Sequence, residues 1–166
     1  MPTFAPNYHQ KEKNAALESF LPHCHKRRYP AKSEIIYPGD PADTLYYVVE
    51  GSVTVLIEDE EGHEIILTYL NDGEFIGEMG LFEEQPYRSV MVRTRTPCLL
   101  AEITYTHLMQ LADGSLADIY KDILFAIGVQ LTQRLLKTSR KVSHLAFLDV
   151  TGRIAGELLE LCKLPD

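Results

Sequence analysis

Several features that define other protein classes are missing from this chain of 166 residues. No apolar run approaches the roughly 18 residues of a membrane span, so no membrane partner is expected. The N-terminus lacks the basic and then apolar layout of a signal peptide, which predicts a cytoplasmic protein. The three cysteines, Cys24, Cys98 and Cys162, are odd in number and far apart. This spacing favours reduced structural thiols over a disulfide framework or a zinc site.

An excess of positive charge is also missing. The chain has 16 Lys and Arg against 24 Asp and Glu, a formal net charge of −8. Binding DNA requires basic residues that displace phosphate counterions, so these residues are not expected to hold nucleic acid by themselves. The hydrophobic content of 45% and charged content of 24% are those of a globular protein. The length predicts one domain with a good core and an appended piece.

Residues 75–92, F-I-G-E-M-G-L-F-E-E-Q-P-Y-R-S-V-M-V, contain the most informative chemistry. Gly77 and Gly80 have no Cβ, so the backbone between them can turn and present its N–H groups to a close ligand. Glu78 lies between the two glycines and places a carboxylate, which only accepts hydrogen bonds, beside those donors.

Arg88 and Ser89 follow this turn eight and nine residues after the second glycine. An arginine fork, a hydroxyl and free backbone amides together make a phosphate site. The nearby carboxylate suits a sugar hydroxyl, because it would repel a second phosphate. An anion site beside a hydroxyl acceptor predicts that the ligand is a nucleotide.

Short apolar segments separated by turn signals occupy the chain from residue 30 to residue 103, which predicts an all-β sandwich or barrel. A mainly β protein with added helices follows, and a small double-stranded jelly-roll β-barrel fits the pattern. The predicted strands are residues 35–37, 45–49, 53–57, 65–70, 90–93 and 98–103.

Helical patterns flank this region. We expect short helices over residues 14–21 and 107–111, and a long helix from about residue 118 to residue 147. The long helix has one narrow apolar stripe, with the polar Thr138 in its gap. Such a stripe predicts a parallel two-helix homodimer seam; the alternative is a helix packed wholly on the barrel. The predicted seam residues are Leu124, Ile127, Leu131, Leu135, Thr138, Val142 and Leu145.

Several segments in register resemble the cyclic-nucleotide-binding domains of the bacterial catabolite activator (cAMP receptor protein, Crp-Fnr) family of transcription regulators. Residues 75–92 resemble the phosphate-binding cassette of that family. The same order of motifs continues in Leu45-Tyr46-Tyr47, Gly51-Ser52-Val53, Ala101-Glu102-Ile103 and residues 145–153. The resemblance covers roughly residues 20 to 166 and implies the jelly roll, the dimerisation helix and a sensory role.

The resemblance also implies roles for individual residues. Arg88 would pair bidentately with the cyclic phosphate, Ser89 would donate its hydroxyl, and Glu78 would accept from the ribose 2′-OH. The backbone of Gly77 and Met79 would complete the phosphate cradle. Val55, Leu67, Thr68 and Leu70 would line the ribose and base, although apolar strand residues also fill barrels. Thr138 and Ser139 on the long helix would meet the base, Ser139 from the partner subunit. Arg134 would be another helix residue that faces the pocket; the alternative is a solvated charge on the helix.

Four parts follow from this interpretation: a flexible leader over 1–13, the barrel with its flanking helices over 14–116, the dimerisation helix over 117–148, and a last helix over 149–166. In the family this last helix opens a winged helix-turn-helix domain, so we expect a sensor fragment. DNA and RNA polymerase would be partners only through that missing domain. The ligand would act through the long helix.

Two ligands fit the sequence. The retained Glu78, Arg88 and Ser89, with the helix residues Thr138 and Ser139, favour cAMP. Pro86 and Tyr87 depart from the family pattern, however, and Arg93-Thr94-Arg95-Thr96 and residues 126–131 resemble a branch that senses cyclic di-GMP. The prediction is therefore cAMP, with cyclic di-GMP or a non-functional pocket as alternatives.

An enzyme is not expected. Cupins share the jelly roll but bind a metal through His and Glu, whereas His63 and His107 are isolated in this sequence. His23 and His25 flank Cys24 without a nearby carboxylate and make a poor set of metal ligands. No metal is predicted.

Overall fold

The computed structural model describes residues 6–84, 86–147 and 150–162. The chain divides into two compact units, residues 1–127 and residues 128–166. The boundary falls inside the long helix, about ten residues after the boundary at 116/117 that the sequence predicts.

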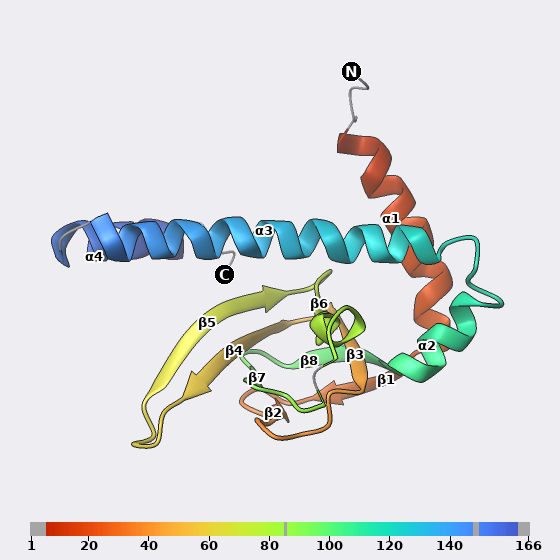
Figure 1. Ribbon diagram of the computed structural model, residues 1–166, viewed down its shortest axis with the longest axis horizontal. Helices are drawn as coiled ribbons and strands as arrows, with labels where there is room; N and C mark the ends of the chain where they lie inside the picture. The colour runs from red at the N-terminus through yellow and green to blue at the C-terminus, as the bar shows by residue number, and fades with distance from the viewer. Residues whose placement is uncertain (1–5, 85, 148–149, 163–166) are drawn as a thin grey trace. The chain divides into compact units, whose positions relative to one another are not determined.

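The first unit contains two four-stranded antiparallel sheets, as the jelly-roll prediction requires (Figure 1). One sheet has the order β1-β8-β3-β6 and the other the order β2-β7-β4-β5. The strands are β1 (His25–Tyr29), β2 (Glu34–Ile36), β3 (Thr44–Glu50), β4 (Ser52–Glu58), β5 (Glu64–Asn71), β6 (Phe75–Ile76), β7 (Met91–Thr94) and β8 (Cys98–Thr104).

The core lies between these sheets, because alternate residues of every paired strand turn the same way. One buried cluster draws on seven of the strands, among them Val48 from β3 and Val53 from β4. The other members are Ile36, Leu70, Ile76, Val92, Cys98 and Leu100. Both sheets therefore depend on one core, which fixes the position of the turn that follows β6.

Helix α1 (Pro6–Phe20) packs on the first unit through its C-terminal end. Ala16, Leu17 and Phe20 are buried, and the Phe20 ring centroid lies 6.3 Å from that of Phe75 in β6. The predicted leader over 1–13 is too long, since α1 begins at Pro6. The spacing of leucine and phenylalanine marks only the packed C-terminal end of α1, which is why the sequence predicts a helix that begins at residue 14.

The remaining helices are close to those predicted. The 3-10 helix η1 (Leu21–His23) follows α1, and α2 (Tyr105–Ala112) follows β8. Thr104 caps α2, because its hydroxyl accepts a hydrogen bond from the backbone N–H of His107. Helix α3 (Tyr120–Phe147) crosses the boundary between the units, and α4 (Val150–Leu161) belongs to the second unit. Within the described ranges, no helix is both long and apolar enough to span a bilayer.

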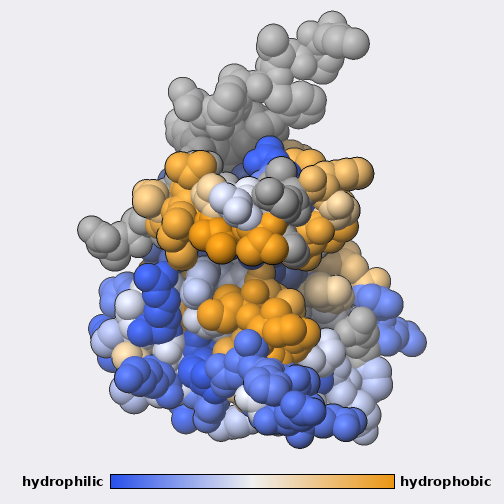
Figure 2. All heavy atoms as spheres, turned by 90° about the vertical axis from the view of Figure 1, so that its left-hand side faces the viewer, coloured by the Kyte–Doolittle hydropathy of each residue, from blue (hydrophilic) through white to orange (hydrophobic). Residues whose placement is uncertain are grey.

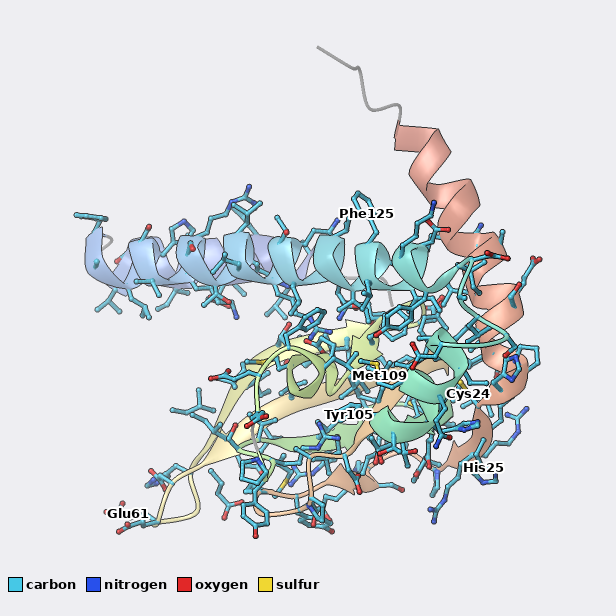
Figure 3. The ribbon with its side chains drawn as sticks, turned by 45° about the vertical axis from the view of Figure 1, so that its right-hand side comes forward. Cys24, His25, Glu61, Tyr105, Met109 and Phe125 are labelled. Atoms are coloured by element: carbon cyan, nitrogen blue, oxygen red, sulfur yellow. The ribbon has the colours of Figure 1, made fainter. Side chains whose placement is uncertain are left out.

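Exposed apolar side chains remain on the β4–β5 hairpin, whose tip is marked by Glu61 in Figure 3. Ile57, Ile65, Ile66 and Leu67 are all exposed. Figure 2 shows hydrophobic atoms gathered on one side of the jelly roll. In β5, therefore, only the side chains near the C-terminal end of the strand are buried or half-buried.

The β3–β4 turn gives the first prediction. Gly51 has a φ of +98°, and a Cβ there would lie 2.5 Å from the Pro97 carbonyl oxygen. Gly39 has a φ of +90° with nothing within 4 Å of its Cβ position. Gly51→Ala combines left-handed strain with overpacking and should lower the free energy of unfolding by about 2–5 kcal/mol. Gly39→Ala adds only the strain, about 1–2 kcal/mol. Urea unfolding measures both, and equal losses would contradict the collision at residue 51.

Candidate nucleotide-binding site

The cassette turn lies directly after β6. Gly77 has a φ of 80° and caps the 3-10 helix η2 (Glu78–Leu81). Glu78 is only 3% exposed, whereas Met79 is exposed. A buried acidic side chain at the start of a short helix lies near the positive ends of the backbone N–H groups. The turn therefore buries the Glu78 side chain at the start of η2 and leaves Met79 exposed.

Arg88 lies against this turn. Its Nη1 donates to the Tyr105 hydroxyl at 3.3 Å, and its Nη2 donates to the Thr44 carbonyl oxygen. The Tyr105 hydroxyl in turn donates to the carbonyl oxygen of Gly77. One donor on each terminal nitrogen of the guanidinium is thus engaged by the protein, out of the five N–H donors that an arginine carries.

The absence of a side chain at residue 77 makes this contact possible. A Cβ at Gly77 would lie 2.6 Å from Arg88 Nη1 and 2.9 Å from the Thr44 carbonyl oxygen. A Cβ at Gly80 would similarly collide with the ring of Tyr105. The two cassette glycines therefore admit the Arg88 and Tyr105 side chains, in addition to shaping the turn.

The backbone of Arg88 is fixed as firmly as its side chain. Its N–H donates to the Asp40 carbonyl and its carbonyl accepts from the Gly39 N–H, both at 2.8 Å. The Ala42 N–H donates to the Pro86 carbonyl at 3.1 Å, beside an isolated bridge between Pro41 and Tyr87. The loop before β3 therefore pairs through its backbone with the segment that carries Arg88. These hydrogen bonds hold the segment in one position although it is not part of a regular strand.

Tyr105 was missed in the sequence analysis. It is the first residue of α2 (labelled in Figure 3), and nothing in the local pattern distinguishes it from a surface tyrosine. Burial raises the pKa of its hydroxyl above the ordinary value, although the neighbouring Arg88 acts in the opposite direction. The hydroxyl therefore remains protonated at neutral pH and can donate to Gly77 while it accepts from Arg88.

The predicted strand residues divide into two groups. Leu70 is 1% exposed and belongs to the hydrophobic core cluster, so its side chain fills the barrel. Val55 and Thr68 are half-buried and lie opposite each other across β4 and β5. Leu67 is exposed, and so is Ser89 beside Arg88.

The predicted helix residues belong to the second unit. Thr138 and Ser139 are exposed on α3, and Arg134 is half-buried there. Of the predicted seam, Leu135, Thr138, Val142 and Leu145 are exposed. Leu124 and Leu131 are half-buried, while Ile127 is fully buried within the single chain. Within the single chain, Ile127 is thus already covered, whereas the later positions of the predicted seam are exposed.

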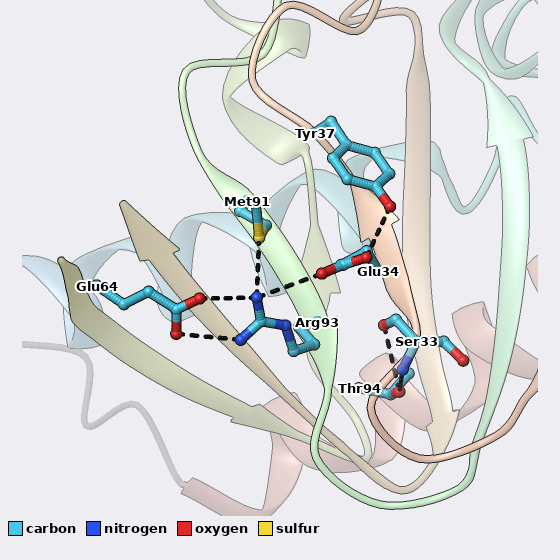
Figure 4. Close-up of polar contacts among 7 residues, drawn as sticks. All are labelled: Ser33, Glu34, Tyr37, Glu64, Met91, Arg93 and Thr94. Carbon is cyan, nitrogen blue, oxygen red and sulfur yellow. Dashed lines mark hydrogen bonds and ion pairs between the residues drawn. The ribbon is translucent and has the colours of Figure 1, made fainter. Parts of the chain in front are cut away.

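Arg93, in the segment that resembles the cyclic di-GMP branch, connects three strands of one sheet (Figure 4). It pairs with Glu64 of β5 at 2.8 Å and with Glu34 of β2 at 3.3 Å. The hydrogen bonds from Arg93 lower the pKa of Glu64. Arg95 places its guanidinium 5.2 Å from the Tyr69 ring centroid. Arg93 and Arg95 thus have partners within the protein. Their presence in the Arg93-Thr94-Arg95-Thr96 segment is therefore explained without a ligand.

Metal chemistry has no site in the part of the chain that the structure describes, where no three His, Cys, Asp or Glu side chains converge. Cys24, Cys98 and Cys162 are free thiols. Burial raises the pKa of the Cys24 thiol to about 12, so this thiol is unreactive at neutral pH.

A jelly roll whose glycine-bordered turn closes on a half-buried arginine defines a cyclic-nucleotide-binding module. The family model for the cyclic nucleotide-binding domain matches residues 26–115. The CRP-like protein Clp of Xanthomonas euvesicatoria is 54% identical over 150 residues, which are 90% of this chain and 65% of the relative; Clp of Xanthomonas campestris (strain B100) gives the same values. The chain thus spans slightly less than two thirds of the curated relatives.

Two solved structures of related regulators are also similar to this chain. The c-di-GMP responsive global regulator CLP of Xanthomonas campestris is 53% identical, with a TM-score of 0.87 over 92% of this chain and 73% of that one. A CRP/FNR-family transcriptional regulator of Thermus thermophilus is 28% identical, with a TM-score of 0.67 over 85% of this chain and 66% of that one. The chain belongs to the CRP/FNR family of transcription regulators, which it joins through its cyclic nucleotide-binding domain. It is accordingly not an enzyme.

The bridge through Tyr105 gives the second prediction. Tyr105→Phe removes one hydrogen bond to Arg88 and leaves the Gly77 carbonyl without its donor, so the free energy of unfolding should fall by about 1–3 kcal/mol. Tyr120→Phe is the matched control, because the Tyr120 hydroxyl contacts only the weak acceptor Met109 Sδ. Urea unfolding of the two variants measures the difference. Similar losses would show that the Tyr105 hydroxyl does not hold the cassette.

Proposed function

We propose that this chain is the sensory and dimerisation portion of a CRP-like transcription regulator that responds to cyclic di-GMP. The observation that carries the choice of ligand is the 53% identity, over nearly the whole chain, to a regulator described as responsive to c-di-GMP. The retained cassette residues by themselves favour cAMP. The similarity favours the alternative ligand instead.

The geometry of Arg88 suits a phosphate of either ligand. Nη1 and Nη2 each donate one hydrogen bond, to Tyr105 and to the Thr44 carbonyl. Three of the five N–H donors of the guanidinium therefore remain for a phosphate. The cassette supports a phosphate ligand, and the choice of cyclic di-GMP rests on the similarity to the c-di-GMP responsive regulator.

In this proposal Arg88 and the backbone around Gly77 and Met79 bind one phosphate, Ser89 donates its hydroxyl, and Glu78 accepts from a sugar hydroxyl. Ligand binding biases the arrangement of α3, because a ligand shifts an equilibrium only by its differential affinity for the two states. The seam of α3 passes that bias to a DNA-binding domain that follows in the full-length protein, where DNA and RNA polymerase are the partners. Thr138, Ser139 and Arg134 would be helix contacts of the ligand.

Calorimetric titration with cyclic di-GMP, cAMP and cGMP tests the ligand. Cyclic di-GMP should bind, and Arg88→Ala should weaken it at least about tenfold, as expected when a charge-assisted hydrogen bond to phosphate is lost. Arg28→Ala is the control, since Arg28 is an exposed cation on β1 of the same unit. Binding of cAMP alone would return the ligand to the first prediction, and binding of none of the three would contradict a sensory role.

The seam is tested separately. Leu135 and Leu145 lie on the same face of α3 and are 67% and 65% exposed. Exposed apolar side chains that form one patch mark an interaction surface. We expect a dimer in sedimentation equilibrium, and a monomer after Leu135→Asp with Leu145→Asp. Leu136→Asp, at an exposed leucine off the stripe, should leave the dimer intact. A wild-type monomer, or a dimer that survives the double substitution, would rule out this seam.

A further inference from the structure

The second unit contains a pocket of its own between α3 and α4, with a volume of about 340 Å³. Six of its lining residues come from α3: Gln133, Leu136, Lys137, Arg140, Lys141 and His144. Helix α4 contributes Gly156 and Glu157. Neither the cassette nor the predicted seam uses this cluster.

The pocket concentrates positive charge in an acidic protein. The chain as a whole has a net charge of −8, yet the sequence contains no Asp or Glu from residue 123 to residue 148. The cations on α3 therefore have no carboxylate three or four residues away on their own helix. Among the described side chains, none forms an ion pair with Lys137, Arg140 or Lys141. Of the described residues that line the pocket, Glu157 alone carries a carboxylate.

The pocket lies on the opposite side of α3 from the predicted seam. With 3.6 residues per turn, Leu135, Val142 and Leu145 cluster on one face of the helix. Lys137, Arg140 and His144 then fall roughly 120–180° from the centre of the seam, whereas Lys141 lies nearer the edge of the seam. Dimerisation through the seam therefore leaves Lys137, Arg140 and His144 uncovered.

Close packing of α4 shapes one wall. A Cβ at Gly156 would lie 3.6 Å from His144 Nδ1, an ordinary contact distance. A long side chain at residue 156 would consequently extend along His144 into the pocket. Glycine weakens a helix interior by about 1 kcal/mol relative to alanine, so its presence in α4 keeps this wall open at some cost in stability.

The chemistry of the lining matches a phosphate compound. Arginine and lysine pair with phosphate oxygens through charge-assisted hydrogen bonds. Gln133, which also lines the pocket, and Glu157 offer acceptors to a sugar hydroxyl or a base edge. Small-molecule pockets span roughly 300–1,000 Å³, which places this one at the small end, suited to a pyrophosphate or a single nucleotide.

We propose that the pocket between α3 and α4 is a binding site for a phosphate-bearing small molecule, separate from the Arg88 cassette. The ligand reaches its phosphate contacts through Lys137, Arg140 and Lys141. The pocket is lined by both α3 and α4. A bound ligand would therefore stabilise one packing of α4 against α3, in the part of the chain that follows the seam.

Calorimetry of the whole chain with inorganic pyrophosphate and with 5′-GMP, at low ionic strength, tests the site. Lys137→Gln with Arg140→Gln should weaken binding at least about tenfold. Lys121→Gln with Arg28→Gln removes the same charge from exposed positions outside the pocket and should change the affinity less than about twofold. Gly156→Met, which fills the pocket without removing charge, should also weaken binding. Circular dichroism checks that each variant is folded.

The outcomes separate this site from the proposed sensor. Arg88→Ala should leave pyrophosphate binding unchanged, whether or not cyclic di-GMP binds to the cassette. Pyrophosphate that binds as tightly as 5′-GMP identifies a site for free phosphates, whereas tighter 5′-GMP that is weakened by Glu157→Gln identifies a nucleotide site. No binding of either probe, equal weakening in the control variant, or loss of binding in Arg88→Ala would overturn the proposal.

Discussion

The Arg88 guanidinium occupies the space that a side chain at residue 77 would need. This close approach requires a glycine, and it requires the segment after β6 and the segment before β7 to lie together. Both conditions depend on the common core of the two sheets, because Ile76 and Val92, next to these segments, belong to the same buried cluster. The contact between Arg88 and the cassette turn is thus a consequence of the common core, and it would be lost with the core.

The fold could be predicted almost completely from the sequence. Alternating apolar residues and glycine-containing turns mark β3, β4, β5 and β8, because each buries one face and ends at a turn. The limits of α1 and of the leader were wrong, since the N-terminal part of α1 carries no apolar periodicity that a pattern could detect. The short β6 was also hidden inside the cassette, where the motif gave no sign of a strand.

The site was predicted less completely. Gly77, Glu78 and Arg88 were recognised, and the first and last of these are brought into contact by the fold. Tyr105 and the Thr44 carbonyl were not, because they reach Arg88 only through tertiary structure, 17 and 44 residues away along the chain. The ligand could not be chosen from the cassette either: the residues that favour cAMP are retained, while the similarity to a c-di-GMP responsive regulator points elsewhere.

The most direct test of the central claim is the side-chain NMR signal of Arg88, followed in labelled protein while cyclic di-GMP is added. If Arg88 exchanges its contacts with Thr44 and Tyr105 for a phosphate, its Nε–Hε resonance should shift in a saturable way, together with the backbone amides of Gly77 and Met79. If those amides and the Arg88 signal stay in place while resonances elsewhere move, the cassette is not the phosphate site.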